Sequence, residues 1–159
     1  MVAIIGIGSP FGDDWAGLEA ARRLSAVPPP GARVVCADRP GVGLLDLFEG
    51  TDAAILIDAA RSGAPVGTLH DLDLRRSSAI VSRLVSSHDI GVGEALELAR
   101  ALGRAPKFGR ILGIEAAPGG ERRPGLSPAV GAGVDRAVER ARHWTEVLER
   151  VGRAHWAGD

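Results

Sequence analysis

Short apolar runs alternate with longer amphipathic segments along most of the chain. Four of these runs, each five residues long and mainly apolar, are residues 2–6, 33–37, 53–57 and 110–114. Such runs, without polar alternation, are typical of strands that are buried on both faces of a sheet. Residues 67–72 alternate apolar and polar side chains instead, which predicts an edge strand.

The segments between these runs have helical patterns. Residues 13–24 place an apolar side chain at every third position, and residues 90–102 gather theirs on one side. Residues 41–48 are expected to form a short helix. Residues 80–85 fit a strand and a helix equally well, so the pattern leaves them open.

The last helix has a clear start. Ser127 is a good N-cap and Pro128 suits the first helical turn. We expect this helix to reach about residue 150 and to be followed by a loose tail over residues 151–159. Residues 1–150 are then long enough for one domain with a substantial core.

Strands that alternate with amphipathic helices indicate an α/β fold with a mainly parallel sheet. In such sheets, ligands bind beyond the carboxyl ends of the strands. The residues that follow each predicted strand are therefore the first place to look for chemistry.

Composition excludes several classes of function. The 159 residues include 19 basic and 20 acidic side chains, and only 4% of the residues are aromatic. Without a basic surplus or stacking platforms, binding to nucleic acid or to an anionic membrane is not expected. No apolar stretch is long enough to span a bilayer, and no basic segment precedes the first apolar run. We expect a cytoplasmic protein, with a monomer as the default state.

The single cysteine, Cys36, rules out an internal disulfide bond and a cysteine-based zinc site. Because it lies in a predicted strand, we expect it to be buried rather than reactive. His70 is expected to be a surface or structural residue.

Carboxylates and one imidazole gather after the predicted strands. They are Asp13 and Asp14 after the first, Asp58 after the third, His88 before the helix at 90–102, and Glu115 after the last. Two carboxylates and a histidine are suitable ligands for nickel, zinc or iron. A cation would also relieve the repulsion between clustered carboxylates.

Each of these residues also has an ordinary structural role open to it. One of the two neighbouring aspartates, Asp13 or Asp14, is expected simply to cap a helix. Asp58 can accept hydrogen bonds from a loop, although an aspartate that ends a wholly apolar strand favours function. Taken alone, His88 is expected to be an entry residue of the next helix, and Glu115 can equally be a charged loop residue.

A nucleotide-binding site is a poor interpretation of the first loop. Gly6, Gly8 and Gly12 follow a strand, but the glycine spacing is a weak signal. Asp13 and Asp14 would also repel a pyrophosphate at the helix start.

A phospho-acceptor receiver domain is the second alternative. Asp58 would be the acceptor, with Ser86 or Ser87 and Lys107 in the later switch positions. However, six residues separate the first strand from the acidic pair, and Lys107 precedes the late strand rather than following it.

Four motifs in order resemble those of the [NiFe]-hydrogenase maturation endopeptidases. They are Gly6-Ile7-Gly8-Ser9 with Gly12-Asp13-Asp14-Trp15-Ala16-Gly17; Ile57-Asp58-Ala59 with residues 63–68; Ser87-His88-Asp89-Ile90-Gly91 with Glu94-Ala95-Leu96; and Gly113-Ile114-Glu115 with residues 125–128. The resemblance extends from residue 2 to about residue 148.

The resemblance implies a five-stranded, mainly parallel sheet between helices on both faces, which is a three-layer sandwich. It also implies removal of the C-terminal extension of a hydrogenase large-subunit precursor after nickel insertion, by an aspartic-type endopeptidase. The family's three metal-contacting positions fall on Asp14, Asp58 and His88, which would serve both metal contact and catalysis. The nickel would come with the precursor rather than be held permanently.

No ordinary protease apparatus is visible in the sequence. It contains no H-E-x-x-H helix and no G-x-S-x-G elbow. We therefore hypothesise that Asp14, Asp58 and His88 contact the nickel of the precursor and so make cleavage depend on metal loading. The alternative is an acidic-site module without proteolytic activity, such as a receiver-like phospho-acceptor or a metal-binding domain.

Overall fold

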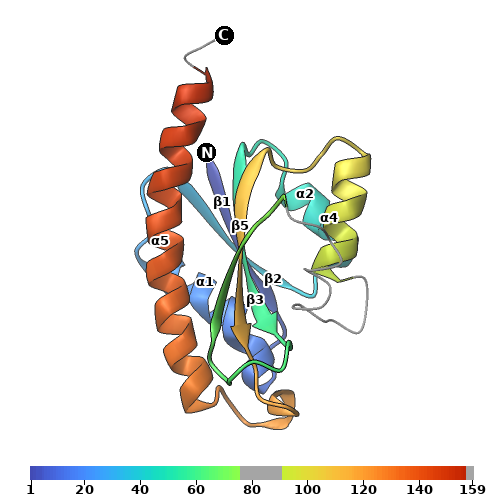
Figure 1. Cartoon of the computed structure of the whole chain (residues 1–159), viewed down its shortest axis with the longest axis vertical. Coiled ribbons are helices and arrows are strands. Elements are labelled where there is room, and N and C mark those ends of the chain that lie inside the picture. The colour runs from blue at the N-terminus through green and yellow to red at the C-terminus, as the bar shows by residue number, and fades with distance from the viewer. Residues whose placement is uncertain (76–90, 157–159) are drawn as a thin grey trace.

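The computed structural model describes residues 1–75 and 91–156, and they form a five-stranded sheet between two layers of helices (Figure 1). The strands are β1 (Val2–Gly8), β2 (Ala32–Asp38), β3 (Ala53–Ala60), β4 (Leu69–Asp73) and β5 (Phe108–Glu115). The helices are α1 (Ala16–Ala26), α2 (Leu44–Leu47), α4 (Val92–Ala101) and α5 (Pro128–Trp156), with 3-10 turns η1 (Gly12–Trp15), η2 (Gly41–Gly43) and η3 (Gly120–Arg122).

The sheet has the order β2-β1-β3-β5-β4. The first four of these strands are parallel, and β4 runs antiparallel to β5 at the edge. The α/β sandwich and the edge strand are thus confirmed. Because β1, β3 and β5 are parallel neighbours, their carboxyl ends meet at one edge of the sheet, and the register places Asp58 beside Gly113 and Ala60 beside Glu115.

Two apolar clusters, one on each face of the sheet, form the core. Along β1, Ile5 and Ile7 belong to the cluster under α2 and α4, while Val2 and Ile4 belong to the cluster under α1 and α5. Successive side chains of a strand point to opposite faces, so a strand covered on both sides needs apolar residues at nearly every position. This explains the unbroken apolar runs in the sequence.

Helix α1 lies unusually close to the sheet. A methyl group added at Gly17 would be 2.1 Å from the carbonyl oxygen of Ile7 and 2.3 Å from that of Ile57. Only a glycine permits this approach, which sets the first turn of α1 directly on β1 and β3 near their carboxyl ends. The residues that precede α1 are thereby held beside the end of β3.

Several details differ from the sequence predictions, among them the end of β1, which reaches Gly8 rather than residue 6. Strand β3 continues past residue 57 to Ala60, so Asp58 lies within the strand rather than after it. Helix α5 continues to Trp156, so the chain is still helical over the first residues of the expected loose tail. Cys36 is exposed rather than buried, because β2 is the other edge strand of the sheet. Residues 80–85 lie outside the described part of the chain.

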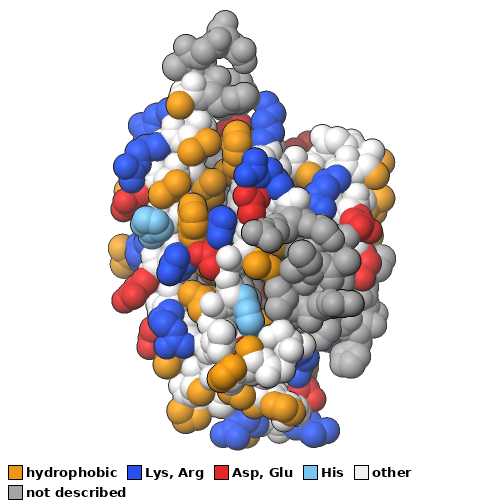
Figure 2. Space-filling model, viewed as in Figure 1, with side chains coloured by type: hydrophobic (Ala, Val, Ile, Leu, Met, Phe, Trp, Pro, Cys, Tyr) orange, Lys and Arg blue, Asp and Glu red, His pale blue; other side chains and the backbone are white. Residues whose placement is uncertain are grey.

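On the face shown in Figure 2, acidic and basic side chains are interspersed along α5. This agrees with the formal net charge of −1. Within residues 1–75 and 91–156, the helices are too short or too polar to cross a membrane.

Candidate active site

The carboxyl edge of the sheet brings together two of the three predicted site residues. Asp14 lies in η1, directly before α1, and Asp58 lies near the end of β3. The third, His88, lies outside the described residues. Among the residues that are described, no group of three His, Cys, Asp or Glu side chains has the arrangement of a metal site.

Asp58 is a buried carboxylic acid. Its side chain is 6% exposed, and Oδ1 accepts a hydrogen bond of 2.8 Å from the backbone N–H of Ala59. Burial raises the pKa of Asp58 well above its usual range, and the nearby charge of Asp14 raises it further, against the lowering effects of the Ala59 N–H and of the Arg61 charge. Asp58 and Asp14 are therefore close enough to act on one another electrostatically.

Asp14 is half-buried and owes its position to the loop before it. The N–H of Ser9 donates to the carbonyl oxygen of Asp14 at 3.2 Å, and the N–H of Asp14 donates to the carbonyl oxygen of Phe11 at 3.1 Å. Gly12 has a φ of +52°, a left-handed conformation that glycine adopts without strain. Within the described residues, no group donates a hydrogen bond to the Asp14 carboxylate.

Asp13, the neighbour of Asp14, has a structural role. Its side chain is fully buried, and its carboxylate accepts hydrogen bonds from the Ser127 N–H at 2.6 Å, the Ser127 hydroxyl at 3.1 Å and the Ala117 N–H at 3.1 Å. It thus ties the loop after β1 to the start of α5. The expectation that one of the two aspartates is structural agrees with this, but Asp13 binds the start of α5 rather than capping α1.

Glu115 is also a buried structural carboxylate, and it is the last residue of β5 rather than a charged loop residue. It is 2% exposed and accepts hydrogen bonds from Ser62, Gly63 and His70. Sequence reasoning missed this cluster because the hydrogen bonds join residues 45 to 53 positions apart. The one feature of the sequence that could have indicated the cluster is the predicted edge strand, because its antiparallel pairing with β5 sets His70 opposite Gly113, two residues before Glu115.

The two alternative interpretations find no support in this arrangement. The acidic residues Asp13 and Asp14 occupy the approach to α1, where a pyrophosphate would have to bind. Lys107 precedes the first residue of β5, so it lies at the amino edge of the sheet, far from Asp58. A receiver-like role that needs Lys107 beside Asp58 is therefore excluded.

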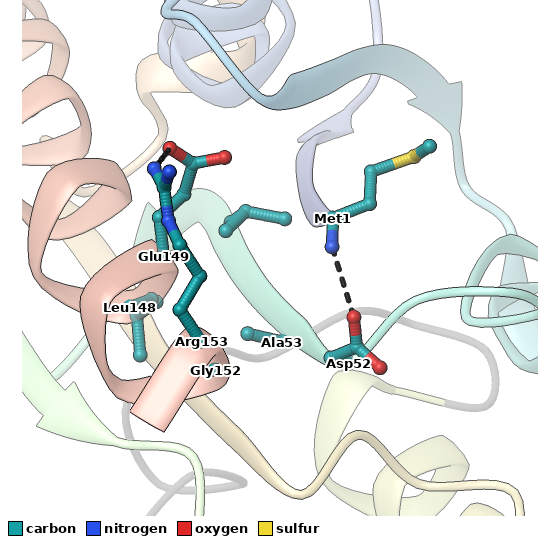
Figure 3. Close-up of a pocket in the computed structure, with 8 residues that line it drawn as sticks. Met1, Asp52, Ala53, Leu148, Glu149, Gly152 and Arg153 are labelled. Atoms are coloured by element: carbon teal, nitrogen blue, oxygen red, sulfur yellow. Dashed lines mark hydrogen bonds and ion pairs between the residues drawn. The ribbon is translucent and has the colours of Figure 1, made fainter. Parts of the chain in front are cut away.

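A separate pocket of about 380 Å³ lies at the other end of the parallel strands, where their amino ends meet (Figure 3). It is lined by Val2 and Ala53, the first residues of β1 and β3, and by the C-terminal part of α5. Its charges are paired, since the N-terminal amine of Met1 binds Asp52 at 2.9 Å. Strands of this length separate the pocket from Asp58 by roughly 15 to 20 Å, so it is no part of the candidate site.

Comparison with known proteins gives matches to a single family. A sequence model of the hydrogenase maturation proteases (HycI) matches residues 30–144. The hydrogenase expression/formation protein HupD of Thiocapsa roseopersicina is 25% identical over 157 aligned residues, which cover 94% of this chain and 71% of HupD.

Solved structures show the same fold. The hydrogenase maturating endopeptidase HybD of E. coli has a TM-score of 0.76 at 24% identity, with 88% of each chain covered. The [NiFe] hydrogenase maturation protease HybD of Thermococcus kodakarensis has a TM-score of 0.66 at 24% identity, with 90% of this chain and 97% of that one covered. Since the family model matches well over half of the sequence, the chain belongs to the hydrogenase maturation protease family.

Proposed function

We propose that this protein is the endopeptidase that removes the C-terminal extension of a [NiFe]-hydrogenase large-subunit precursor after nickel insertion. The match of residues 30–144 to the maturation protease family carries this proposal. The adjacency of Asp14 and Asp58 at the carboxyl edge of the sheet supports it, because this edge is where α/β proteins bind their ligands.

The nickel ion is part of the substrate in this proposal. The carboxylate of Asp14 has no donor within the described residues, and Asp58 lies close enough to feel its charge. Two carboxylates of this kind suit a divalent cation that arrives with the precursor, and His88 would supply an imidazole of the type that nickel prefers. Contact with the metal would position the scissile peptide and would restrict cleavage to loaded precursors.

Hydrolysis requires a water molecule to add to the scissile carbonyl group, and a group must accept the proton that this water loses. Asp14 and Asp58 are the carboxylates beside which that water would stand. We therefore assign the enzyme to the aspartic type, with a carboxylate as the general base. The proton then passes to the amine of the departing extension, so the step balances without any further reactant.

The test is cleavage of the cognate precursor in its nickel-loaded and nickel-free forms, followed by intact-mass measurement. We expect loss of the C-terminal extension from the loaded form alone. The triple variant Asp14→Asn, Asp58→Asn, His88→Ala should be inactive. Asp38→Asn is the matched control, because it removes an exposed carboxylate at the end of β2 on the same edge of the sheet.

Two results would overturn parts of this proposal. Wild-type cleavage rates in the triple variant would exclude these residues from the reaction. Equal cleavage of both precursor forms would remove the metal from recognition. If no form is cut, retention of a metal by the protein would favour the non-proteolytic acidic-site module.

A further inference from the structure

The loop over residues 61–68 joins β3 to β4 and begins three residues after Asp58. Backbone hydrogen bonds to residues 115 and 116 hold it at both ends. At its start, the Ala116 N–H donates to the carbonyl oxygen of Ala60 at 2.9 Å. At its end, the Glu115 N–H donates to the carbonyl oxygen of Thr68 at 2.9 Å, and the Gly67 N–H donates to that of Glu115 at 2.8 Å. Backbone hydrogen bonds around residue 115 thus close both ends of the loop.

The Glu115 side chain holds the first part of this loop. Its Oε1 accepts the backbone N–H groups of Ser62 and Gly63, both at 2.8 Å, and its Oε2 accepts the Ser62 hydroxyl at 2.8 Å. Gly63 has a φ of +86°, so the turn that presents these donors adopts a left-handed conformation that suits glycine. A carboxylate that binds two successive N–H groups fixes the backbone at that point.

His70 completes the cluster from strand β4. Its Nε2 lies 2.9 Å from Glu115 Oε2 and 3.4 Å from the Ser62 hydroxyl, and its side chain is 19% exposed. Burial works to raise the pKa of Glu115, but the hydrogen bonds to its carboxylate outweigh burial and hold the pKa below its usual value. Glu115 is therefore a charged hydrogen-bond acceptor at neutral pH.

The cluster does not have the geometry of a serine-protease triad. In a triad, one ring nitrogen of histidine faces the serine and the other faces the carboxylate. Here the same nitrogen, Nε2 of His70, faces both groups, and the Ser62 hydroxyl donates to Glu115 directly. The arrangement orders a loop instead of activating a nucleophile.

The first residue of the loop is a cation that follows Asp58 by three positions along the chain. Arg61 stands directly before Ser62, and its charge acts on Asp58. Its guanidinium is 30% exposed and pairs with Glu121 of η3 at 3.3 Å. Because Arg61 directly precedes Ser62 and Gly63, the path of its backbone depends on how firmly those two residues are held.

We propose that Glu115 is a positioning residue for precursor cleavage, which fixes Ser62 and Gly63 and thereby holds Arg61 and the loop at the rim of the site. This inference rests on the proposed function. In that function the scissile peptide would lie beside Asp14 and Asp58, and this loop begins three residues after Asp58. Loss of the loop's order therefore lowers kcat more than it raises KM.

The test is steady-state cleavage of the nickel-loaded precursor by Glu115→Ala and Ser62→Ala. We expect kcat to fall at least about tenfold in Glu115→Ala, and less in Ser62→Ala, with KM within about threefold of the wild type. The matched control is Asp71→Ala, because Asp71 on β4 is also a largely buried carboxylate that binds Arg110, Arg140 and Trp144 but none of the loop. It should lower Tm and leave kcat within about twofold.

The outcomes separate the inference from the function on which it rests. An unchanged kcat in Glu115→Ala, or a rise in KM alone, overturns the positioning role while wild-type cleavage still stands. If Glu115→Ala does not fold, Ser62→Ala decides, since it removes a single exposed hydroxyl, and an unchanged kcat there also overturns the inference. Absence of cleavage by the wild-type protein overturns the proposed function and this inference together.

Discussion

The two neighbouring aspartates of the first loop should respond very differently to substitution. Asp13→Ala removes a buried carboxylate and leaves three donors, the Ser127 N–H, the Ser127 hydroxyl and the Ala117 N–H, without their acceptor. Hydrogen bonds to a charged group each contribute about 1.5 to 3 kcal/mol, but relaxation and water recover part of that sum. We expect the free energy of unfolding to fall by about 2 to 4 kcal/mol.

The control for this prediction is Asp14→Asn, one residue further along the chain. Its carboxylate is half-buried and has no donor within the described residues, so the free energy of unfolding should change by less than about 0.5 kcal/mol. Urea unfolding followed by circular dichroism measures both values, and Tm should fall by roughly 5 to 15 °C in Asp13→Ala. The division of roles would be refuted if Asp13→Ala lowered the free energy of unfolding by less than about 0.5 kcal/mol, or if Asp14→Asn lowered it by more than Asp13→Ala does.

Two further predictions concern α1. Gly17→Ala would place a methyl group against two backbone carbonyl oxygens, so it should lower the free energy of unfolding by about 2 kcal/mol or more. The control is Gly131→Ala on α5, where the methyl group meets open space, and it should leave the free energy of unfolding unchanged or raise it by up to about 1 kcal/mol. Equal urea midpoints for the two variants would contradict the close approach of α1. Glu19 has its pKa lowered to about 2, chiefly by its hydrogen bond from Arg22, so its ion pairs stabilise the fold fully above pH 4.5 and lose this effect as the pH falls toward 2. Urea unfolding should therefore show Glu19→Gln less stable than the wild type by about 1 to 3 kcal/mol at pH 7 and by roughly half of that or less at pH 3, and a difference that does not depend on pH would count against this pairing.

Most of the fold was predictable because it depends on local patterns. Strands β1, β3 and β5 are covered by helices on both faces, so their apolar runs are unbroken and easily found. Ser127 and Pro128 marked the start of α5 correctly. The end of β3 was placed too early because Asp58 interrupts the apolar run, although the strand continues through it to Ala60. Cys36 was misjudged because sequence alone does not show which strand lies at the edge of the sheet.

The candidate site was predictable only in part. Because β1 and β3 are parallel neighbours, Asp14 and Asp58 lie at the end of the sheet where the carboxyl ends of the strands meet, as a mainly parallel sheet predicts. Only the family resemblance pointed to Asp14 rather than Asp13 as the metal-contacting residue. Local pattern could not show that Asp13 is structural, because its hydrogen bonds join residues 104 and 114 positions away. The roles of Glu115, Ser62 and His70 depend on equally distant contacts, which no local pattern reveals.

The central claim, that this member of the maturation protease family cuts a hydrogenase large-subunit precursor, has one direct measurement. The purified protein is incubated with its nickel-loaded cognate precursor, and the intact mass of the precursor is followed over time. The account predicts a single shorter product that lacks the C-terminal extension, formed by the wild type and by Asp38→Asn but not by Asp58→Asn. A precursor mass that stays unchanged with the wild type, or the same product from Asp58→Asn at the wild-type rate, would contradict it.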